Sequence, residues 1–502
     1  MNMERSIPKS INFQDVLPVA VPAVARRRRF YPQNGTTFNA AGSSEIRIDV
    51  GSVNSLLDPQ HSYLEFTAQN TNALQTVGLD IGGGHVLFDE VRVEQGGRVL
   101  AREQSHNRLH ASILSVAQLN MEGGLSESIS QGQRGCNSRA GGNAGQLTPA
   151  VLAGGTGDEF VNQSHNDTLQ FAAGASIRFT MAMPTGLFTQ DKLLPLPLVS
   201  QQNPITLVLV MTPSQNVGAW SAAPAVGDIS INRINYVAQM IEVGSDVIGQ
   251  MRMMQEMGGG QLTISSTDIE HSTDVIPANS TGEIPIRIPA RKKSIKSLLF
   301  AIQSDDYTQA APGSSVSDFM SLSFGGNANM NTYQMKVGSV VYPPTPVQCW
   351  GNVARAAGVA LPLPIQERGE CAMELAKALG SLGFTNPTGR LSTLIYGTNC
   401  APAVAAGQPP LADGDNGDGA GNDIAPIGGQ EVCACPFGLD LAAFQHTAIE
   451  SGIDSETMAM ETTLIIDVNA VASGIEDKNV HCYLLYDQHY YFNSDGSVTF
   501  SN

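Results

Sequence analysis

Four consecutive arginines, Arg26 to Arg29, are the residues of this sequence with the clearest capacity for binding chemistry. Guanidinium groups form charge-assisted hydrogen bonds with phosphates and carboxylates, so the run predicts a contact with an anion. It stands out because the formal net charge of the 502-residue chain is −18. Two hypotheses follow: the run binds an anionic partner, or it is a solvated patch that keeps the chain soluble. Four charges give only modest, salt-sensitive affinity for a polyanion.

An acidic loop, Asp413 to Gly419, has the composition of a calcium site. In the calcium loop of EF-hand proteins, the sixth position is a glycine and the twelfth a bidentate glutamate. Asp418 and Ile424 stand at those positions here. We therefore expect a hydrated acidic loop that binds no metal ion.

The cysteines and histidines follow no recognisable metal or catalytic spacing. Cys433 and Cys435 have no second pair at zinc spacing, and the seven scattered cysteines are expected to be reduced thiols. The nine histidines form no compact constellation along the sequence. Motifs for a serine nucleophile elbow, a zinc protease and a phosphate-binding loop are absent from the sequence. We predict that the protein is not an enzyme, with no catalytic, cofactor-binding or metal-binding residues, no cofactor and no small-molecule substrate.

The composition favours a protein with a buried core and a weakly charged surface. Hydrophobic residues make up 42% of the chain and charged residues 15%, a profile common among extracellular β proteins and coat proteins. The acidic balance argues against a general nucleic-acid coat. The apolar segment Val16–Pro22 has prolines within it and basic residues after it, so we expect no signal peptide. Apolar runs such as Ile205–Met211 are too short to span a membrane, and we expect a soluble protein.

Alternating hydrophobic residues predict strands along most of the chain. Ile46, Ile48 and Val50 lie on one face of such a segment, which is the pattern of a half-buried strand. Gly96 and Gly97 between two alternating segments indicate a tight hairpin. Further strands are expected at 63–66, 88–94, 98–102, 176–181, 205–211, 229–243, 282–288, 295–303, 320–324, 333–341, 464–466, 480–485 and 489–492.

Three segments have helical periodicity. Residues 109–116, with Ser105 as a candidate N-cap, and residues 367–379 each predict a lone helix. We expect these two helices to cover an open end of a barrel, although docking between subunits is the alternative. A third, methionine-rich helix at 246–257 ends in Gly258–Gly260, which we predict to be a domain boundary.

Four landmarks recur in the same order in the two halves of the chain, which indicates an internal duplication. They are the strands 44–48 and 282–288, the two lone helices, the turns Pro184–Leu187 and Pro436–Leu439, and the apolar strands 205–211 and 464–466. Each half holds roughly eight strands, one helix and one long loop, an inventory that a jelly roll accommodates.

The predicted fold is therefore mainly β, with two tandem eight-stranded jelly rolls, each carrying a short helix and a long loop insertion. We predict an extended N-terminal arm at 1–32 and a first jelly roll at 33–257, with an insertion at about 122–166. The second jelly roll is predicted at 258–502, with an insertion at about 385–430.

Several segments resemble those of a known family. Tyr333–Pro346, which contains Tyr-Pro-Pro-Thr-Pro, is similar to a segment shared by double jelly-roll major capsid proteins of the virophage and polinton-like virus type. The resemblance extends from about residue 30 to the end of the chain. Weaker matches lie at Leu57–Pro59 with Tyr63–Phe66, at Leu193–Leu198, and at Pro436–Leu441 with Ser451–Asp454.

The resemblance implies a structural major capsid protein in the virion of a DNA virus. Such proteins form homotrimers, and each trimer is a pseudo-hexameric capsomer of an icosahedral capsid. The implied partners are neighbouring capsomers, penton proteins and minor capsid proteins. Arg26, Arg27, Arg28 and Arg29 would form an interior contact arm toward an internal membrane or the genome, and the two insertions would be outward or inter-subunit loops.

Two other functions remain open from the sequence. A β-sandwich adhesin or carbohydrate-binding surface protein would share the strand content, but it should carry an export signal and often disulfides. A glycoside-active jelly-roll enzyme would need paired carboxylates on an inner sheet.

Overall fold

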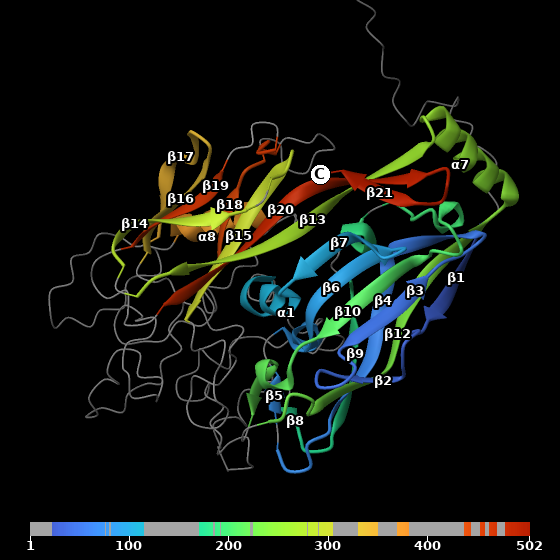
Figure 1. The fold of residues 1–502 in the computed structure, drawn as a ribbon, viewed down its shortest axis with the longest axis horizontal. Helices are drawn as coiled ribbons and strands as arrows, with labels where there is room; N and C mark the ends of the chain where they lie inside the picture. Colours follow the sequence, from blue (N-terminus) through green and yellow to red (C-terminus); the bar gives the residue numbers. More distant parts are fainter. Residues whose placement is uncertain are drawn as a thin grey trace, which may run out of the picture.

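The computed structural model describes a β protein, as the sequence predicts, with two sets of facing antiparallel sheets (Figure 1). The predicted insertions at 122–166 and 385–430, the strand at 320–324 and the pair Cys433 and Cys435 lie outside the described residues. The described residues are 23–75, 77–79, 82–114, 170–183, 186–190, 192–220, 224–278, 280–289, 291–304, 330–349, 369–380, 436–442, 452–456, 461–468 and 477–501.

The first set of sheets contains eight main strands in two layers. One layer has the order β1 (Ala23–Phe30), β12 (Ile229–Val243), β4 (Ser55–Asn70), β9 (Ser176–Met181), with β2 (Thr37–Asn39) also paired to β12. The facing layer has the order β3 (Glu45–Val50), β10 (Ile205–Met211), β6 (Phe88–Gln95), β7 (Arg98–Gln104). A small side sheet has the order β11 (Gly218–Trp220), β5 (Val77–Leu79), β8 (Gln170–Phe171).

The second set repeats this arrangement. One layer has the order β13 (Gln261–Ile276), β20 (Lys478–Asn493), β15 (Ile295–Ser304), β18 (Phe437–Asp440), with β21 (Val498–Ser501) also paired to β20. The facing layer has the order β14 (Gly282–Ile288), β19 (Thr462–Val468), β16 (Met330–Val337), β17 (Val340–Gln348). In both sets the main strands run first, eighth, third, sixth in one layer and second, seventh, fourth, fifth in the other. This is jelly-roll topology, and its repetition confirms the predicted fold class.

Three of the four sequence landmarks mark equivalent strands or helices in the two jelly rolls, and one does not. β3 and β14 are the second strands, β10 and β19 are the seventh, and both lone helices follow the fifth strand. The turn landmark is wrong, because Gly186–Thr189 is the short helix α6 after the sixth strand, whereas Phe437–Asp440 is the sixth strand itself. A four-residue motif without periodicity carries too little information to fix a topological position.

Among the strand boundaries that differ from the prediction, two change how the strands are connected. The predicted pair at 480–485 and 489–492 is the single sixteen-residue strand β20. The predicted strand at 333–341 is instead a hairpin of β16 and β17, which turns at Gly338 with positive φ. Gly96 and Gly97 also have positive φ at the predicted hairpin between β6 and β7.

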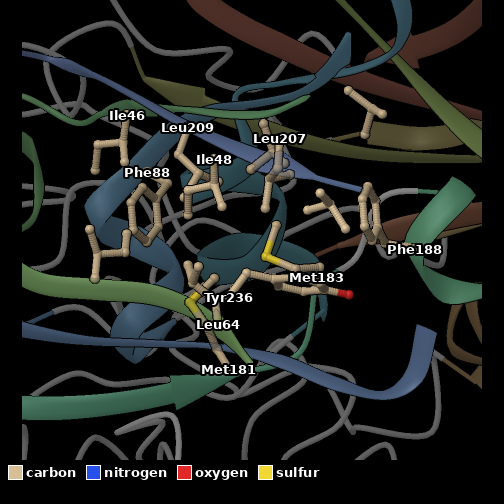
Figure 2. Close-up of a cluster of buried hydrophobic side chains, with 14 of the residues drawn as sticks. Ile46, Ile48, Leu64, Phe88, Met181, Met183, Phe188, Leu207, Leu209 and Tyr236 are labelled. Carbon is tan, nitrogen blue, oxygen red and sulfur yellow. The ribbon is translucent and has the colours of Figure 1, made fainter. Parts of the chain in front are cut away.

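The core of the first jelly roll lies between its two layers. Figure 2 shows Ile46, Ile48, Leu207 and Leu209 of the smaller layer above Tyr236 of the larger one. Alternation along each strand directs one face of every layer into this space, because successive side chains of a strand point to opposite faces. Three phenylalanines stack or meet edge to face in the same core, with ring centroids 5.3 Å apart for each of the pairs Phe66–Phe179 and Phe66–Phe88.

Each lone helix contributes to the core cluster of its own jelly roll, through Ala111 in the first and Cys371 in the second. That the helices cover the open ends of the barrels stays a prediction. The first comprises α1 (His106–Arg108) and the π-helical turn η3 (Leu109–Leu114), and the second is α8 (Gly369–Leu379). Both pack on the outer face of the larger sheet of the second jelly roll, where Leu109 and Leu375 share an apolar cluster with Tyr483. Ser105 precedes α1 in the left-handed region, and its side chain forms no capping hydrogen bond.

The helix predicted at 246–257 is α7 (Ser245–Met257), which connects β12 to β13. The glycines predicted as a boundary, Gly258–Gly260, lie between α7 and β13 and thus between the two sets of sheets. None of the helices in the described residues has the length and apolar character needed to cross a membrane.

Replacement of Gly438 by alanine is expected to lower the free energy of unfolding. A Cβ atom there would lie 2.8 Å from Cβ of Ala378 and 3.1 Å from Cα of Leu375, so α8 would be pushed away from β18. Overpacking of this kind costs about 1–3 kcal/mol. Chemical denaturation of Gly438→Ala measures the change, with Gly249→Ala as control. A Cβ at Gly249 in α7 meets no atom within 4 Å, so that variant should be neutral or more stable. Equal stability of the two variants would contradict the tight contact of α8 with the sheet.

Candidate functional site: the arginine strand and the junction of the two jelly rolls

The arginine run lies in the first jelly roll, not in an arm outside it. Arg26, Arg27, Arg28 and Arg29 are all exposed residues of β1, which pairs antiparallel with β12 at the edge of the larger sheet. The predicted arm at 1–32 is thus corrected for residues 23–30, since these belong to the sheet; residues 1–22 lie outside the described residues. Charged residues on an edge strand also hinder edge-to-edge aggregation, so the location alone does not establish a ligand.

Two of the four arginines are neutralised by their own sheet. Arg26 Nε lies 3.2 Å from Glu242 Oε2, and an Arg29 nitrogen lies 3.3 Å from Glu65 Oε2. Glu65 also pairs with Arg178 of β9, so one carboxylate serves two guanidinium groups. The two guanidinium groups come from β1 and β9, the two edge strands of the sheet, and their charge exceeds that of Glu65.

The other two arginines lie over aromatic rings. The Arg27 guanidinium carbon is 5.1 Å from the centroid of Tyr63, and that of Arg28 is 4.8 Å from the centroid of Phe30. Among the described residues, no carboxylate lies within ion-pair distance of Arg27 or Arg28. These two side chains are the ones that can meet an external anion without first breaking an internal ion pair.

An open groove of about 760 Å³ lies beside the end of β1. Its lining is rich in hydroxyl and amide groups, with Thr36, Gln69 and Asn232 near the guanidinium-bearing Arg233. The described residues that line it include no acidic side chain, so this groove lacks the paired carboxylates that glycoside hydrolysis requires.

Strand β20 joins the apolar cores of the molecule (Figure 1). Near its start, Cys482 and Leu484 point into the core of the second jelly roll, and Tyr483 points to the opposite face, where the lone helices pack. Near its end, Tyr490 and Phe492 belong to the core cluster of the first jelly roll. One continuous strand therefore contributes to three clusters, and the two jelly rolls share buried surface.

Polar contacts at the end of β20 fix the same junction. The Gln95 side chain of β6 donates to the carbonyl oxygens of Asn203 at 3.1 Å and Gly496 at 2.9 Å, and accepts from the Val498 N–H at 2.5 Å. Gln488 of β20 donates to the Leu100 carbonyl of β7 at 2.9 Å. These buried amides specify one position of the C-terminal hairpin against the first jelly roll, because a shifted hairpin would leave them unpaired.

A cationic and histidine-rich group occupies the centre of the junction. A guanidinium nitrogen of Arg108 in α1 is 3.3 Å from Nδ1 of His481, which is 3.2 Å from Nε2 of His271. Burial lowers the pKa of His481 well below its ordinary value, and nearby Arg108 and His271 lower it further. Burial is also the main cause that lowers the pKa of Arg108, while the charge of Asp89 opposes the decrease.

The structure also brings together three histidines for which the sequence predicted no cluster. His85, His106 and His110 are buried side by side, so the prediction of no compact histidine constellation is wrong. His106 and His110 are four residues apart in a helical segment, a spacing that places two side chains on one face and was the available signal. His85 precedes β6, and the β6–β7 hairpin brings it back beside His106, which a linear spacing does not reveal.

Removal of the Gln95 side chain is expected to loosen the C-terminal hairpin. Gln95→Ala leaves the Val498 N–H and two carbonyl groups without these partners, at a cost of about 1–3 kcal/mol for an unsatisfied buried group. Denaturation should show the loss, and hydrogen exchange should show faster exchange at Val498. Gln202→Ala, at an exposed glutamine, is the control. Unchanged exchange at Val498 in Gln95→Ala would contradict the assigned role.

Acidification is expected to destabilise the junction through His271. Burial lowers its pKa to about 4, from an ordinary 6.5, with a smaller contribution from Arg108. Between these values the unfolded chain binds a proton that the folded chain excludes, so the free energy of unfolding falls as the pH falls through this window. His271→Gln should therefore show a smaller loss between about pH 7 and pH 5 than the wild type. Other shifted groups such as Asp268 are common to both proteins. A variant with unchanged pH dependence would refute the assignment.

The sequence matches no protein-family model, and no curated protein matches it. Solved structures do match over nearly the whole chain. The Faustovirus major capsid protein has a TM-score of 0.55 at 8% identity, covering 97% of this chain and 93% of that one. A chain of the Sputnik virophage structure has a TM-score of 0.53 at 9% identity, covering 100% and 93%. VP54 of PBCV-1, fitted into a reconstruction of Sputnik, has a TM-score of 0.52 at 10% identity, covering 98% and 99%.

At such low identity the likeness shows a shared fold. The coverage of both jelly rolls in each comparison means that the tandem arrangement is shared, and not only a single sandwich. The chain has the double jelly-roll fold of these viral capsid proteins.

Proposed function

We propose that this chain is the major capsid protein of a virus and has a structural role in the virion. The observation that carries the proposal is the pair of jelly rolls of identical strand order in one chain, the fold also found in the Faustovirus and PBCV-1 capsid proteins. The proposed role is structural rather than catalytic, because the chain would be a subunit of the capsid shell.

The proposed building unit is a homotrimer that acts as a pseudo-hexameric capsomer. Three chains with two similar domains each would present six similar domains around a threefold axis, so the trimer fits a site of hexagonal symmetry. Cyclic closure buries both sides of every subunit and leaves no open end for further addition. The proposal requires the two jelly rolls to keep a fixed relative position, and the shared clusters along β20 support this requirement.

Neighbouring capsomers are the further proposed partners, together with penton and minor capsid proteins. Assembly contacts need exposed apolar surface, and α7 offers one. Its Met253, Met254 and Met257 side chains are 64%, 62% and 89% exposed. Exposed clusters of large apolar residues on a soluble protein commonly mark interaction sites, so we assign this helix to a contact between chains.

The trimer can be tested on the purified chain by size-exclusion chromatography with light scattering. We expect a particle with three times the 53.0 kDa mass of the chain. The double variant Met253→Ser/Met257→Ser is expected to weaken either the formation of the trimer or the association of trimers with one another. The double variant Arg252→Gln/Glu256→Gln on the same helix is the control. A stable monomer that never assembles at any concentration would count against the capsid proposal and favour an adhesin-like binding protein.

We further propose that the arginine strand contacts an anionic partner inside the shell, either the genome, a membrane or an acidic minor protein. The exposed Arg27 and Arg28 carry the contact, because Arg26 and Arg29 already have carboxylate partners. The excess guanidinium charge around Glu65 strengthens the local positive field.

Binding to DNA and to anionic vesicles at several salt concentrations tests this contact. Arg27→Gln/Arg28→Gln should weaken binding, and the slope of log affinity against log salt should fall by about 0.9 for each lost phosphate contact. Arg26→Gln/Arg29→Gln is the matched control with the same charge change and should weaken binding less. Equal loss in the two variants would mean a diffuse charge effect, and no binding by the wild type would overturn the proposal.

A further inference from the structure

Three buried histidines meet at one end of the β6–β7 hairpin. His85 lies in the 3₁₀ turn η2 (Gly83–Leu87) that leads into β6, and His106 and His110 lie in α1 and η3, which follow β7. The hairpin folds these segments back on each other. The three residues are 3%, 0% and 6% exposed, so water does not surround the imidazoles.

The ring nitrogens of the three histidines lie close enough together to share one ion. One ring nitrogen from each histidine lies within 4.8 Å of the others. His85 Nδ1 and His106 Nε2 are 3.1 Å apart, and the rings of His85 and His110 stack with centroids 3.7 Å apart. Two nitrogens bound to one tetrahedral zinc ion at about 2.0–2.1 Å lie roughly 3.3 Å from each other. The rings of His85 and His110 are parallel here, with an interplanar angle of 3°, so one of them must turn about its Cβ–Cγ bond before both lone pairs can reach one ion.

Glu103 orients one of these rings. Its Oε1 lies 3.0 Å from Nδ1 of His106, and both groups are buried. A carboxylate on Nδ1 holds the proton there, so the lone pair of Nε2 points toward His85. Histidines that bind metals commonly have such a carboxylate behind them, because it fixes the tautomer and raises the basicity of the ligand nitrogen.

A purely structural role does not explain why the buried ring nitrogens of His110 have no hydrogen-bond partner in the described part of the chain. A buried polar group without a partner costs about 1–3 kcal/mol, and an apolar residue here would avoid that cost.

We propose that His85, His106 and His110 form a binding site for a divalent transition-metal ion of the zinc class. Imidazole nitrogens suit zinc, copper, nickel and iron, and a buried site made of imidazoles alone with an orienting carboxylate is typical of zinc. The ion would join the turn before β6 to the helix after β7.

The site also bears on the junction of the jelly rolls. Leu109 and Ile113, on either side of His110, pack against the outer face of the second jelly roll. An ion on His106 and His110 would fix the segment that carries these contacts. Metal binding would therefore stabilise the docking of one jelly roll on the other as well as the local turn, since binding to the folded state alone raises the stability of that state.

Metal content of the full-length protein, expressed with added zinc and then desalted, tests the site directly. We expect one zinc equivalent per chain in the wild type and in His61→Gln, which changes an exposed histidine of β4 paired with Asp58. His110→Phe, which keeps a flat ring of similar size, is expected to lose the zinc. Wild-type protein without stoichiometric zinc, or His110→Phe that retains it, would overturn the proposal.

Two further measurements keep the test independent of whether the variant folds. Cobalt(II) added to wild-type protein stripped of metal should give the intense visible absorption of a tetrahedral nitrogen site, and zinc should displace it. A chelator should lower the midpoint of thermal unfolding of the wild type and of His61→Gln, and leave that of His110→Phe unchanged. Wild-type protein with no cobalt spectrum and no response to the chelator would show that the histidines are core residues only.

Discussion

Strand β20 is the constraint on which the rest of the structure depends. Sixteen residues of unbroken strand supply side chains to the core of the second jelly roll, to the cluster under the lone helices and to the core of the first jelly roll. The strand is buried on both faces along most of its length, and β13 pairs with it from end to end. Because each cluster needs β20 in one position, neither jelly roll can move without breaking contacts in the other. Gln95, Gln488 and Arg108 then add directional bonds that select one register at the junction.

The contacts along β20 hold the two jelly rolls of the duplicated chain in one relative orientation. Two jelly rolls joined by a flexible linker would sample many orientations, and ordering them during assembly would cost conformational entropy. The shared clusters remove that cost before assembly begins. The methionines of α7 and the arginines of β1 remain exposed at the surface. The chain thus separates an apolar interior that fixes shape from a polar, sparsely charged exterior on which contacts are made.

The sequence predicted what depends on short-range periodicity and missed what depends on tertiary packing. Alternation at Ile46 and Ile48 or at Ile205–Met211 located the strands, and the order of repeated segments predicted two jelly rolls. The break placed within β20 was wrong because the polar residues Asp487 and Gln488 resemble a turn, whereas in the structure they form hydrogen bonds with Ser294 and with the Leu100 carbonyl. The arginine run appeared to be an arm, since four charges in a row show no alternation; strand pairing with β12 holds it in the sheet. The histidine cluster was not predicted, because the β6–β7 hairpin brings together residues that are distant in the sequence.

Cryo-electron microscopy of the purified oligomer tests the central claim most directly, namely that β20 locks two jelly rolls into one block that trimerises. The account predicts a threefold particle of hexagonal outline, in which both jelly rolls of every chain retain their relative orientation and β20 runs unbroken between them. A particle without threefold symmetry, or one in which the two jelly rolls of a chain adopt variable orientations about a broken β20, would contradict it.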